Sequence, residues 1–173
     1  MTQSTAETAA FSLVIDRTID APRERVFEAF TQPEHLSRWW AAREGYSTPI
    51  AEVDLRVGGS YRLGMQDPEQ DHPFVVGGVF REVTPPEKLV FTWIWETAPH
   101  DSHWTPPQTL VTVEFSDLDG STGVRLTHEG FSDENMRDEH TRGWGGCLES
   151  LTKYLAIAVG SAGLFVDLSA RLA

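Results

Sequence analysis

The sequence SDENMRDEHTRGWGGCLESLTKYLAIAV, residues 132–159, decides the fold of this chain. Its large apolar side chains recur at helical spacing, with Cys147 and Tyr154 at the edges of the same stripe: Trp144, Leu148, Leu151, Leu155 and Ala158. Ser132 is predicted to cap the helix N-terminus, with Asp133 and Glu134 beside the positive end of its dipole. A long amphipathic helix of this kind must bury its stripe against another layer.

The segments before this helix alternate apolar and polar residues, which is typical of half-buried strands. Strands are predicted over residues 11–19, 53–57, 61–65, 74–83, 89–95, 111–115 and 124–131. Gly58-Gly59 turns the chain between the second and third of these, so that Val53, Leu55 and Val57 form one arm of a hairpin. Gly77-Gly78 predicts a bulge or a sharp bend inside the fourth strand.

Two short helices are predicted after the first strand. Ala21-Pro22 begins one of them, because proline is favoured in the first turn of a helix, and its buried face would carry Val26, Phe27 and Phe30. Thr31-Gln32-Pro33 ends it and starts a second helix with Leu36, Trp39 and Trp40. The expected fold class is α+β: a strongly curved antiparallel sheet wraps the long C-terminal helix, and the two short helices close one end.

The length of 173 residues favours one domain, residues 11–159, between a disordered leader (residues 1–10) and a tail (residues 160–173). The tail has a helical pattern that would pack on the same chain or join two copies, so a monomer or a homodimer is expected: Leu164, Phe165, Leu168 and Leu172. A net charge of -12 makes nucleic acid and anionic membranes poor partners. The single cysteine and the absence of a signal-peptide pattern favour the cytoplasm.

A curved sheet and one helix do not fill the space between them everywhere. An empty cavity costs about 24 cal/mol per Å³, so ~300 Å³ would cost roughly 7 kcal/mol, comparable with the stability of a domain. Aromatic side chains should therefore fill part of the space, and a ligand or water the rest. We expect the ligand-binding site to be formed by eight residues, each of which could instead simply pack in the core: Phe30, Trp39, Trp40, Tyr61, Trp93, Trp95, His128 and Trp144.

His128 shares a strand face with Val124 and Leu126, which places an imidazole among apolar groups. It could hydrogen-bond a ligand or act as an acid or base, or it could be a structural histidine with satisfied bonds. His100-Asp101-Ser102-His103 has metal-ligating residue types but no further partners, so no metal is expected. No cofactor is expected either, because the chain has no phosphate-binding glycine loop and no known catalytic motif.

Several segments resemble the START-like, or SRPBCC, superfamily: DAPRERVF (residues 20–27), PEHLSRWW (33–40), VGGSYR (57–62), PPEKLVFTW (85–93), THEGF (127–131) and Gly143-Trp144 in the last helix. The match is to the branch similar to activators of the 90-kDa heat-shock-protein ATPase, and it spans residues 11–158. The resemblance implies the helix-grip fold, in agreement with the periodicity.

The superfamily includes lipid and hormone binders, polyketide cyclases and aromatases. The resemblance and the aromatic faces together favour a cytoplasmic protein that holds a small apolar or aromatic molecule between sheet and helix. A cyclase, hydratase or hydrolase that uses His128 is the enzyme alternative, and the sequence does not decide between binding and turnover. A protein-interaction module with a chaperone as partner is the third reading.

Overall fold

Seven antiparallel strands and three helices make up the part of the chain that the computed structural model describes, residues 10–96 and 107–162. The strands form one sheet in the order β1-β7-β6-β5-β4-β3-β2. The elements follow the chain as β1 (Phe11–Ile19), α1 (Arg23–Thr31), α2 (Pro33–Trp39), β2 (Ser47–Val53), β3 (Ser60–Gln66), β4 (Phe74–Thr84), β5 (Lys88–Trp95), β6 (Thr109–Leu118), β7 (Ser121–Phe131) and α3 (Glu134–Ala162). The predicted α+β helix-grip fold is confirmed.

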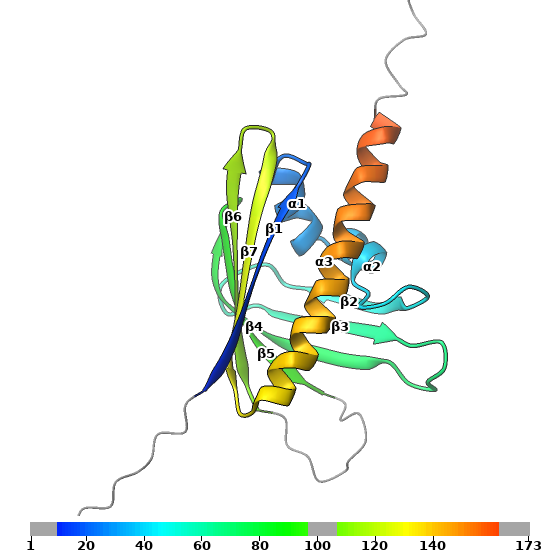
Figure 1. Cartoon of the computed structure of the whole chain (residues 1–173), viewed down its shortest axis with the longest axis vertical. Helices are drawn as coiled ribbons and strands as arrows, with labels where there is room; N and C mark the ends of the chain where they lie inside the picture. The colour runs from blue at the N-terminus through cyan, green and yellow to red at the C-terminus, as the bar shows by residue number, and fades with distance from the viewer. Residues whose placement is uncertain (1–9, 97–106, 163–173) are drawn as a thin grey trace, which may run out of the picture.

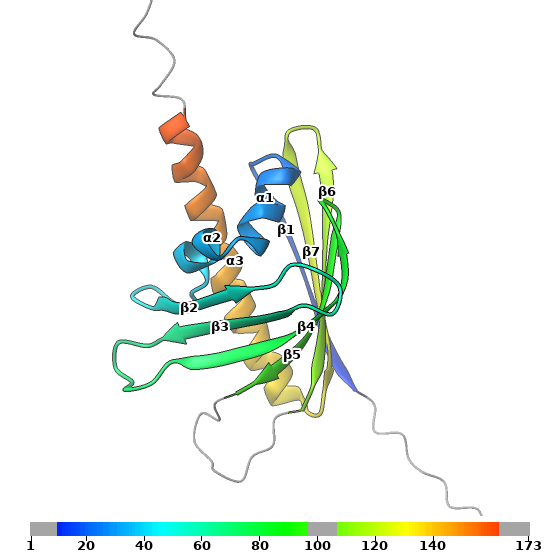
Figure 2. The same cartoon turned by 180° about the vertical axis from the view of Figure 1, so that it is seen from behind.

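The sheet is strongly bent around α3. In Figure 1, β1, β6 and β7 stand upright while β2 and β3 run across them, and α3 passes diagonally over the same face. Figure 2 shows from behind that α1 and α2 lie at one end of this arrangement, beside α3. The core therefore lies between the concave face of the sheet and the helices.

The stripe of α3 is buried as its spacing predicts. Five of its side chains are at most 3% exposed: Trp144, Cys147, Leu148, Leu151 and Leu155. Tyr154 packs against this core while partly exposed, and its hydroxyl bonds to His35 Nδ1 of α2 at 2.6 Å. The side chain of Ala158 lies outside the described part of the chain.

The N-terminal cap of α3 differs from the prediction. Asp133, and not Ser132, accepts the hydrogen bond of the Met136 backbone N–H, at 2.8 Å. Asp133 precedes the first helical residue directly, so its carboxylate reaches the third N–H of the helix, whereas the Ser132 hydroxyl donates to Asp133 at 3.3 Å. The prediction that Ser132 is the cap was wrong by one residue.

The connection between β2 and β3 is longer than the apolar alternation predicts, because β2 lies earlier in the chain. β2 ends at Val53, so Leu55 and Val57 lie in the connection and not in a strand. Backbone hydrogen bonds from Arg56 N–H to Asp54 and from Gly59 N–H to Arg56 curl this connection, and an Arg56–Asp54 ion pair spans it. Local turn bonds outweigh the alternating pattern here.

A bend in β4 lies where the two glycines predict it. The β4–β5 ladder has no paired residues at Gly78 and Val79, and its register shifts between Phe80 and Glu82. A Cβ on Gly78 would lie 1.9 Å from the Thr92 carbonyl oxygen, so only glycine fits this close approach. The Thr92 side chain supplies an acceptor at this interruption of the ladder, because its Oγ1 accepts the hydrogen bond of the Val79 N–H at 2.9 Å.

Three predicted features fall on parts of the chain that the structure does not describe. The predicted leader lies there except for Ala10, and the predicted tail lies there except for residues 160–162, which continue α3. The segment from His100 to His103, with its metal-ligating residue types, is also outside the described residues.

Candidate functional site

A small apolar cavity, lined by side chains that are buried except for Val53, lies between the concave face of the sheet and the helices. Its ten lining side chains come from seven elements and from the residue after α2: Phe30, Leu36, Trp40, Val53, Tyr61, Leu63, Phe80, Leu89, Phe91 and Trp144. They are all apolar or aromatic, and the only polar side-chain groups among them are the Tyr61 hydroxyl and the indole N–H groups of Trp40 and Trp144.

The cavity measures about 30 Å³. One water molecule occupies about 30 Å³ of liquid water, whereas a benzene-sized ligand needs a cavity of ~150 Å³. The aromatic side chains thus fill most of the space that the curved sheet leaves open. A ligand larger than one small group enters only if a lining side chain moves.

Four of the predicted site residues line this cavity together: Phe30, Trp40, Tyr61 and Trp144. Tyr61 is held rigidly, because its hydroxyl donates to the Thr92 carbonyl oxygen at 2.6 Å and burial raises the pKa of this phenol. Trp40 and Trp144 meet edge to face, with ring centroids 5.3 Å apart.

The other four predicted residues lie around the cavity without lining it. Trp93 contacts both Trp40 and Trp144, with ring centroids 5.8 and 5.1 Å apart. Trp39 is fully buried and its indole N–H donates to the Ala29 carbonyl oxygen at 2.8 Å, which fastens α2 to α1. Trp95 is half-buried at the end of β5 and contacts Trp93 at 5.6 Å.

His128, the last of them, is fully buried on β7 with both ring nitrogens engaged. Nδ1 accepts the Trp144 indole N–H at 3.0 Å, so the ring proton is on Nε2, which lies 2.7 Å from Thr109 Oγ1. Burial, with a smaller contribution from His140, lowers the pKa of His128 to about 2. The imidazole is therefore neutral and hydrogen-bonded at both ends.

His140 on α3 is a second imidazole that the sequence analysis missed. Its Nε2 accepts the Trp95 indole N–H at 3.0 Å, and its Nδ1 lies 2.7 Å from the Met136 carbonyl oxygen. Burial lowers its pKa. The signal was present in the sequence, because Met136, His140 and Trp144 follow one another at steps of four and extend the buried stripe of α3.

Cys147 on α3 is a buried, free cysteine. Burial raises the pKa of the Cys147 thiol to about 12, so this cysteine is a small apolar core residue. Within residues 10–96 and 107–162, no three His, Cys, Asp or Glu side chains gather closely enough to hold a metal ion. The arrangement suits enclosure of an apolar molecule.

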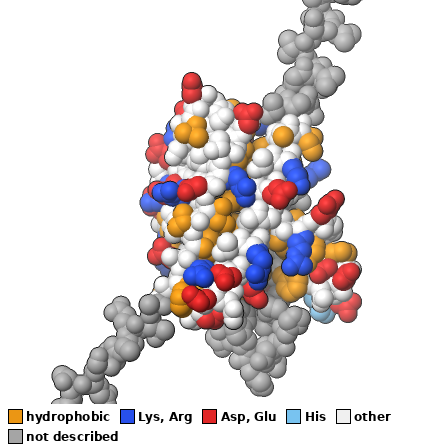
Figure 3. Space-filling model, in the orientation of Figure 1, with side chains coloured by type: hydrophobic (Ala, Val, Ile, Leu, Met, Phe, Trp, Pro, Cys, Tyr) orange, Lys and Arg blue, Asp and Glu red, His pale blue; other side chains and the backbone are white. Residues whose placement is uncertain are grey.

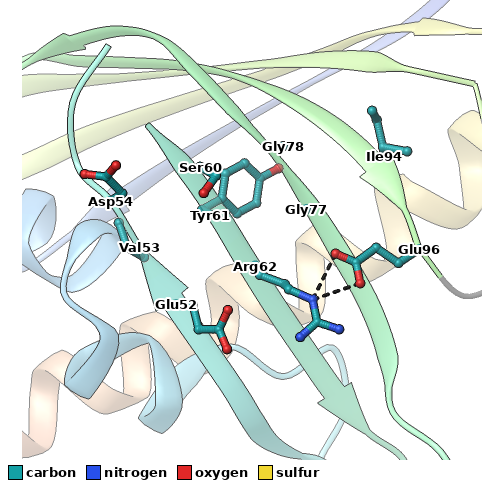
Figure 4. A pocket seen from close by; sticks show the side chains of 10 residues that line it. All are labelled: Glu52, Val53, Asp54, Ser60, Tyr61, Arg62, Gly77, Gly78, Ile94 and Glu96. Carbon is teal, nitrogen blue, oxygen red and sulfur yellow. Dashed lines mark hydrogen bonds and ion pairs between the residues drawn. The ribbon is translucent and has the colours of Figure 1, made fainter. Parts of the chain in front are cut away.

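A larger hollow of about 640 Å³ lies on the opposite, outer face of β2–β5 (Figure 4). Arg62 of β3 crosses Gly77 in this hollow, and its Nε bonds both carboxylate oxygens of Glu96, at 2.8 and 3.0 Å. Glu52 and Asp54 lie at its other side. The hollow has a charged lining and its one arginine is already paired with a carboxylate, so the apolar cavity is the stronger candidate site.

The outer surface shows charges of both signs. Acidic and basic side chains lie interspersed over the face that Figure 3 displays. Exposed ion pairs such as Arg125–Asp16 and Lys153–Glu149 join neighbouring strands or turns, as expected for a solvated surface. Among the described helices none is long and apolar enough to cross a membrane.

Comparison with known proteins agrees with the fold and the resemblance. A solved structure from Chromobacterium violaceum is 26% identical, with a TM-score of 0.72, over 82% of this chain and 94% of the other. An AHSA1 protein from Silicibacter pomeroyi is 26% identical, with a TM-score of 0.71, over 86% and 99% of the two chains. An AHSA1-like protein from Aeromonas hydrophila is 25% identical, with a TM-score of 0.69, over 93% and 100%.

No curated protein of the set that was compared matches the chain. The model of one family, described as "Activator of Hsp90 ATPase homolog 1-like protein", matches residues 20–156, which is more than half of the sequence. The helix-grip architecture and the relatives named above agree with this match. The chain therefore belongs to the Activator of Hsp90 ATPase homolog 1-like family of the START-like, or SRPBCC, superfamily, and is a domain of the ligand-binding type.

Proposed function

We propose that this protein binds a small, largely apolar or aromatic molecule between the concave face of the sheet and α3. The observation that carries the proposal is the apolar cavity, because its lining comes from three helices and four strands and is apolar or aromatic throughout. A site of this composition recognises a ligand by excluding water from it and by its shape.

The ligand needs more room than about 30 Å³, and Trp40 is the side chain that can provide it. Trp40 is the one lining residue that belongs to no helix or strand, since it follows the last residue of α2. Its backbone is held by hydrogen bonds to Leu36 and Thr48, so the movement we propose is a rotation of the indole alone. The vacated space would merge with the existing cavity.

Binding without turnover is the function that these side chains support. An acid–base role for His128 would require it to give up a hydrogen bond to Trp144 or Thr109, and its pKa of about 2 keeps it neutral at ordinary pH. The reduced, buried Cys147 agrees with a cytoplasmic protein. A chaperone contact, which the family's name suggests for its activators, is the alternative outcome of the test below.

Thermal unfolding in the presence of apolar, aromatic and acyl small molecules tests the proposal. A ligand at a hundredfold excess over its Kd adds about 2.7 kcal/mol to the free energy of unfolding, which raises Tm by several degrees in a domain of this size. We expect a selective rise with some members of the panel. If no member raises Tm and the protein instead captures a chaperone in a pull-down, the interaction module replaces the binder.

A pair of matched variants locates the binding in this cavity. Leu63→Val removes one methylene from the lining, whereas Leu118→Val removes the same group at a position that is 49% exposed on β6. One missing methylene in an apolar pocket changes affinity by about 10–200-fold, so Leu63→Val should weaken binding by at least about tenfold and Leu118→Val should leave it unchanged. Equal affinities in both variants would place the ligand elsewhere.

A further inference from the structure

Three indole N–H groups and two imidazoles meet beside the cavity. Trp144 donates to His128 Nδ1 and Trp95 donates to His140 Nε2, both at 3.0 Å. The second ring nitrogen of each imidazole has another partner: His128 Nε2 lies 2.7 Å from Thr109 Oγ1, and His140 Nδ1 lies 2.7 Å from the Met136 carbonyl oxygen. The cluster therefore has one indole donor more than it has imidazole acceptors.

Trp93 holds the surplus donor. It is 4% exposed, and its Nε1 has no hydrogen-bond partner among the described residues. The rings around it belong to Trp40, Trp95, Trp144, His128 and His140, with centroids 5.1 to 6.2 Å away. Buried N–H groups without a partner are rare and costly, so this one calls for an acceptor from outside the cluster.

The neighbours of Trp93 also restrict the charge of that acceptor. Each imidazole accepts the hydrogen bond of an indole N–H and is therefore neutral. The cation–π contact found among the described residues joins Arg137 to Phe11, and none involves the Trp93 ring. A carboxylate in these surroundings would lose its hydration without gaining a counter-charge. A neutral oxygen, such as that of a ketone or an ester, meets one N–H without this penalty.

Trp93 is separated from the cavity by one layer of aromatic rings. Its ring packs against Trp40 and Trp144, which both line the cavity, and Trp40 is the side chain whose rotation would admit the ligand. We propose that the ligand carries one neutral carbonyl oxygen, which accepts the hydrogen bond of Trp93 Nε1 while the rest of the molecule fills the cavity. This inference rests on the proposed function and adds the chemical class of the ligand to it.

Two probes of the same shape test the inference. Acetophenone and α-methylstyrene differ only in a carbonyl oxygen in place of a methylene group, and benzoate supplies the charged counterpart. The measured quantity is the ratio of the two neutral probes' Kd values, in the wild-type protein and in Trp93→Phe. Any loss of packing in the variant affects both probes alike, so the change in the ratio reports the N–H group alone.

We expect the preference for acetophenone to fall about tenfold in Trp93→Phe, as for the loss of one hydrogen bond, and benzoate to bind weakest to the wild-type protein. An unchanged ratio overturns the inference while the proposed function stands. If neither neutral probe binds while another member of the small-molecule panel raises Tm, the inference is overturned and the proposed function stands; if no member of the panel raises Tm, both are overturned.

A second measurement, NMR of the Trp93 indole N–H, follows binding in the wild-type protein. The Trp93 indole N–H resonance, assigned by its absence in the spectrum of Trp93→Phe, should move to lower field when acetophenone is added and should stay in place with α-methylstyrene. A resonance that already shows a hydrogen bond in the ligand-free protein, at the position of the bonded Trp95 and Trp144 indoles, overturns the inference, because water or the chain itself would then supply the acceptor.

Discussion

Gly146 is the residue at which α3 approaches the segment after α2 most closely. A Cβ at this position would lie 1.9 Å from the Ala42 carbonyl oxygen, a distance that no real contact allows. Its neighbour Gly145 has no such contact, since a Cβ there would meet nothing within 4 Å. A side chain therefore fits at Gly145 but not at Gly146, although the two glycines are adjacent in the same helix.

We predict that Gly146→Ala lowers the free energy of unfolding by about 1–3 kcal/mol, because α3 must move away from Ala42. Gly145→Ala is the matched control, and it should raise the free energy of unfolding by up to about 1 kcal/mol, since alanine favours the helix. The urea midpoints of the two variants measure the difference. Shifts of the same sign in both variants would contradict the assigned role of Gly146.

At the scale of elements, the bend of the sheet depends on contacts between β3, β4 and β5. Thr92 of β5 accepts twice: its carbonyl oxygen takes the Tyr61 hydroxyl at 2.6 Å, and its Oγ1 takes the Val79 N–H at 2.9 Å. Gly78 makes this approach possible, because a side chain there would collide with the Thr92 carbonyl. Tyr61 and Phe91, on the strands beside the bend, both line the cavity.

Tyr61→Phe should lower the free energy of unfolding by about 1–3 kcal/mol, because it removes a buried hydroxyl from a buried carbonyl oxygen. Tyr46→Phe is a control of the same chemistry, since the Tyr46 hydroxyl donates to Asp67 at 2.8 Å where solvent has access. We expect that control to cost about 0.5 kcal/mol or less. Equal losses in urea unfolding would show that the hydroxyl of Tyr61 does not stabilise the bend.

For the molecule as a whole, His128 connects the sheet to α3. It links Thr109 of β6 and Trp144 of α3 through its two ring nitrogens. Burial lowers its pKa from 6.5 to about 2, so the unfolded chain binds more protons than the folded one throughout this range. The contribution of His128 to the free energy of unfolding is therefore fully present above about pH 6.5 and is lost as the pH falls below that value. The lowered pKa of His140 acts in the same direction.

Between pH 7 and pH 5, we predict a loss of about 2 kcal/mol in the free energy of unfolding from His128 alone. His128→Gln keeps an acceptor for Trp144 and a donor for Thr109 but does not titrate, so it should remove that part of the pH dependence. Urea unfolding at a series of pH values gives both curves. If the curves of wild type and variant run parallel, His128 is not the group that titrates.

The elements were predictable because each depends on neighbours in the chain. The spacing of Trp144, Leu148 and Leu151 places them on one helix face whatever the helix packs against, and it predicted the buried stripe of α3. The alternation from Leu89 to Trp95 predicted β5 in the same way. The two local errors, the Ser132 cap and the strand through Leu55 and Val57, occurred at element ends, where single turn bonds decide.

The lining of the candidate cavity was predictable in part from residue types. Aromatic side chains on inward-facing positions could be assigned to the groove, and four of them line one cavity. The role of His140 could also have been found from its position on the stripe of α3. The small cavity volume could not, because it depends on how rings from seven elements interlock in three dimensions.

The helix-grip fold could be predicted from the sequence, since hydrophobic periodicity and glycine positions act over a few residues. The pairing of donors with acceptors could be seen only in the folded molecule. Trp144 and Trp95 find imidazoles while Trp93 does not, although the three indoles look alike in the sequence. Hydrogen bonds form within about 3 Å and at fixed angles, so they depend on where distant elements come to rest.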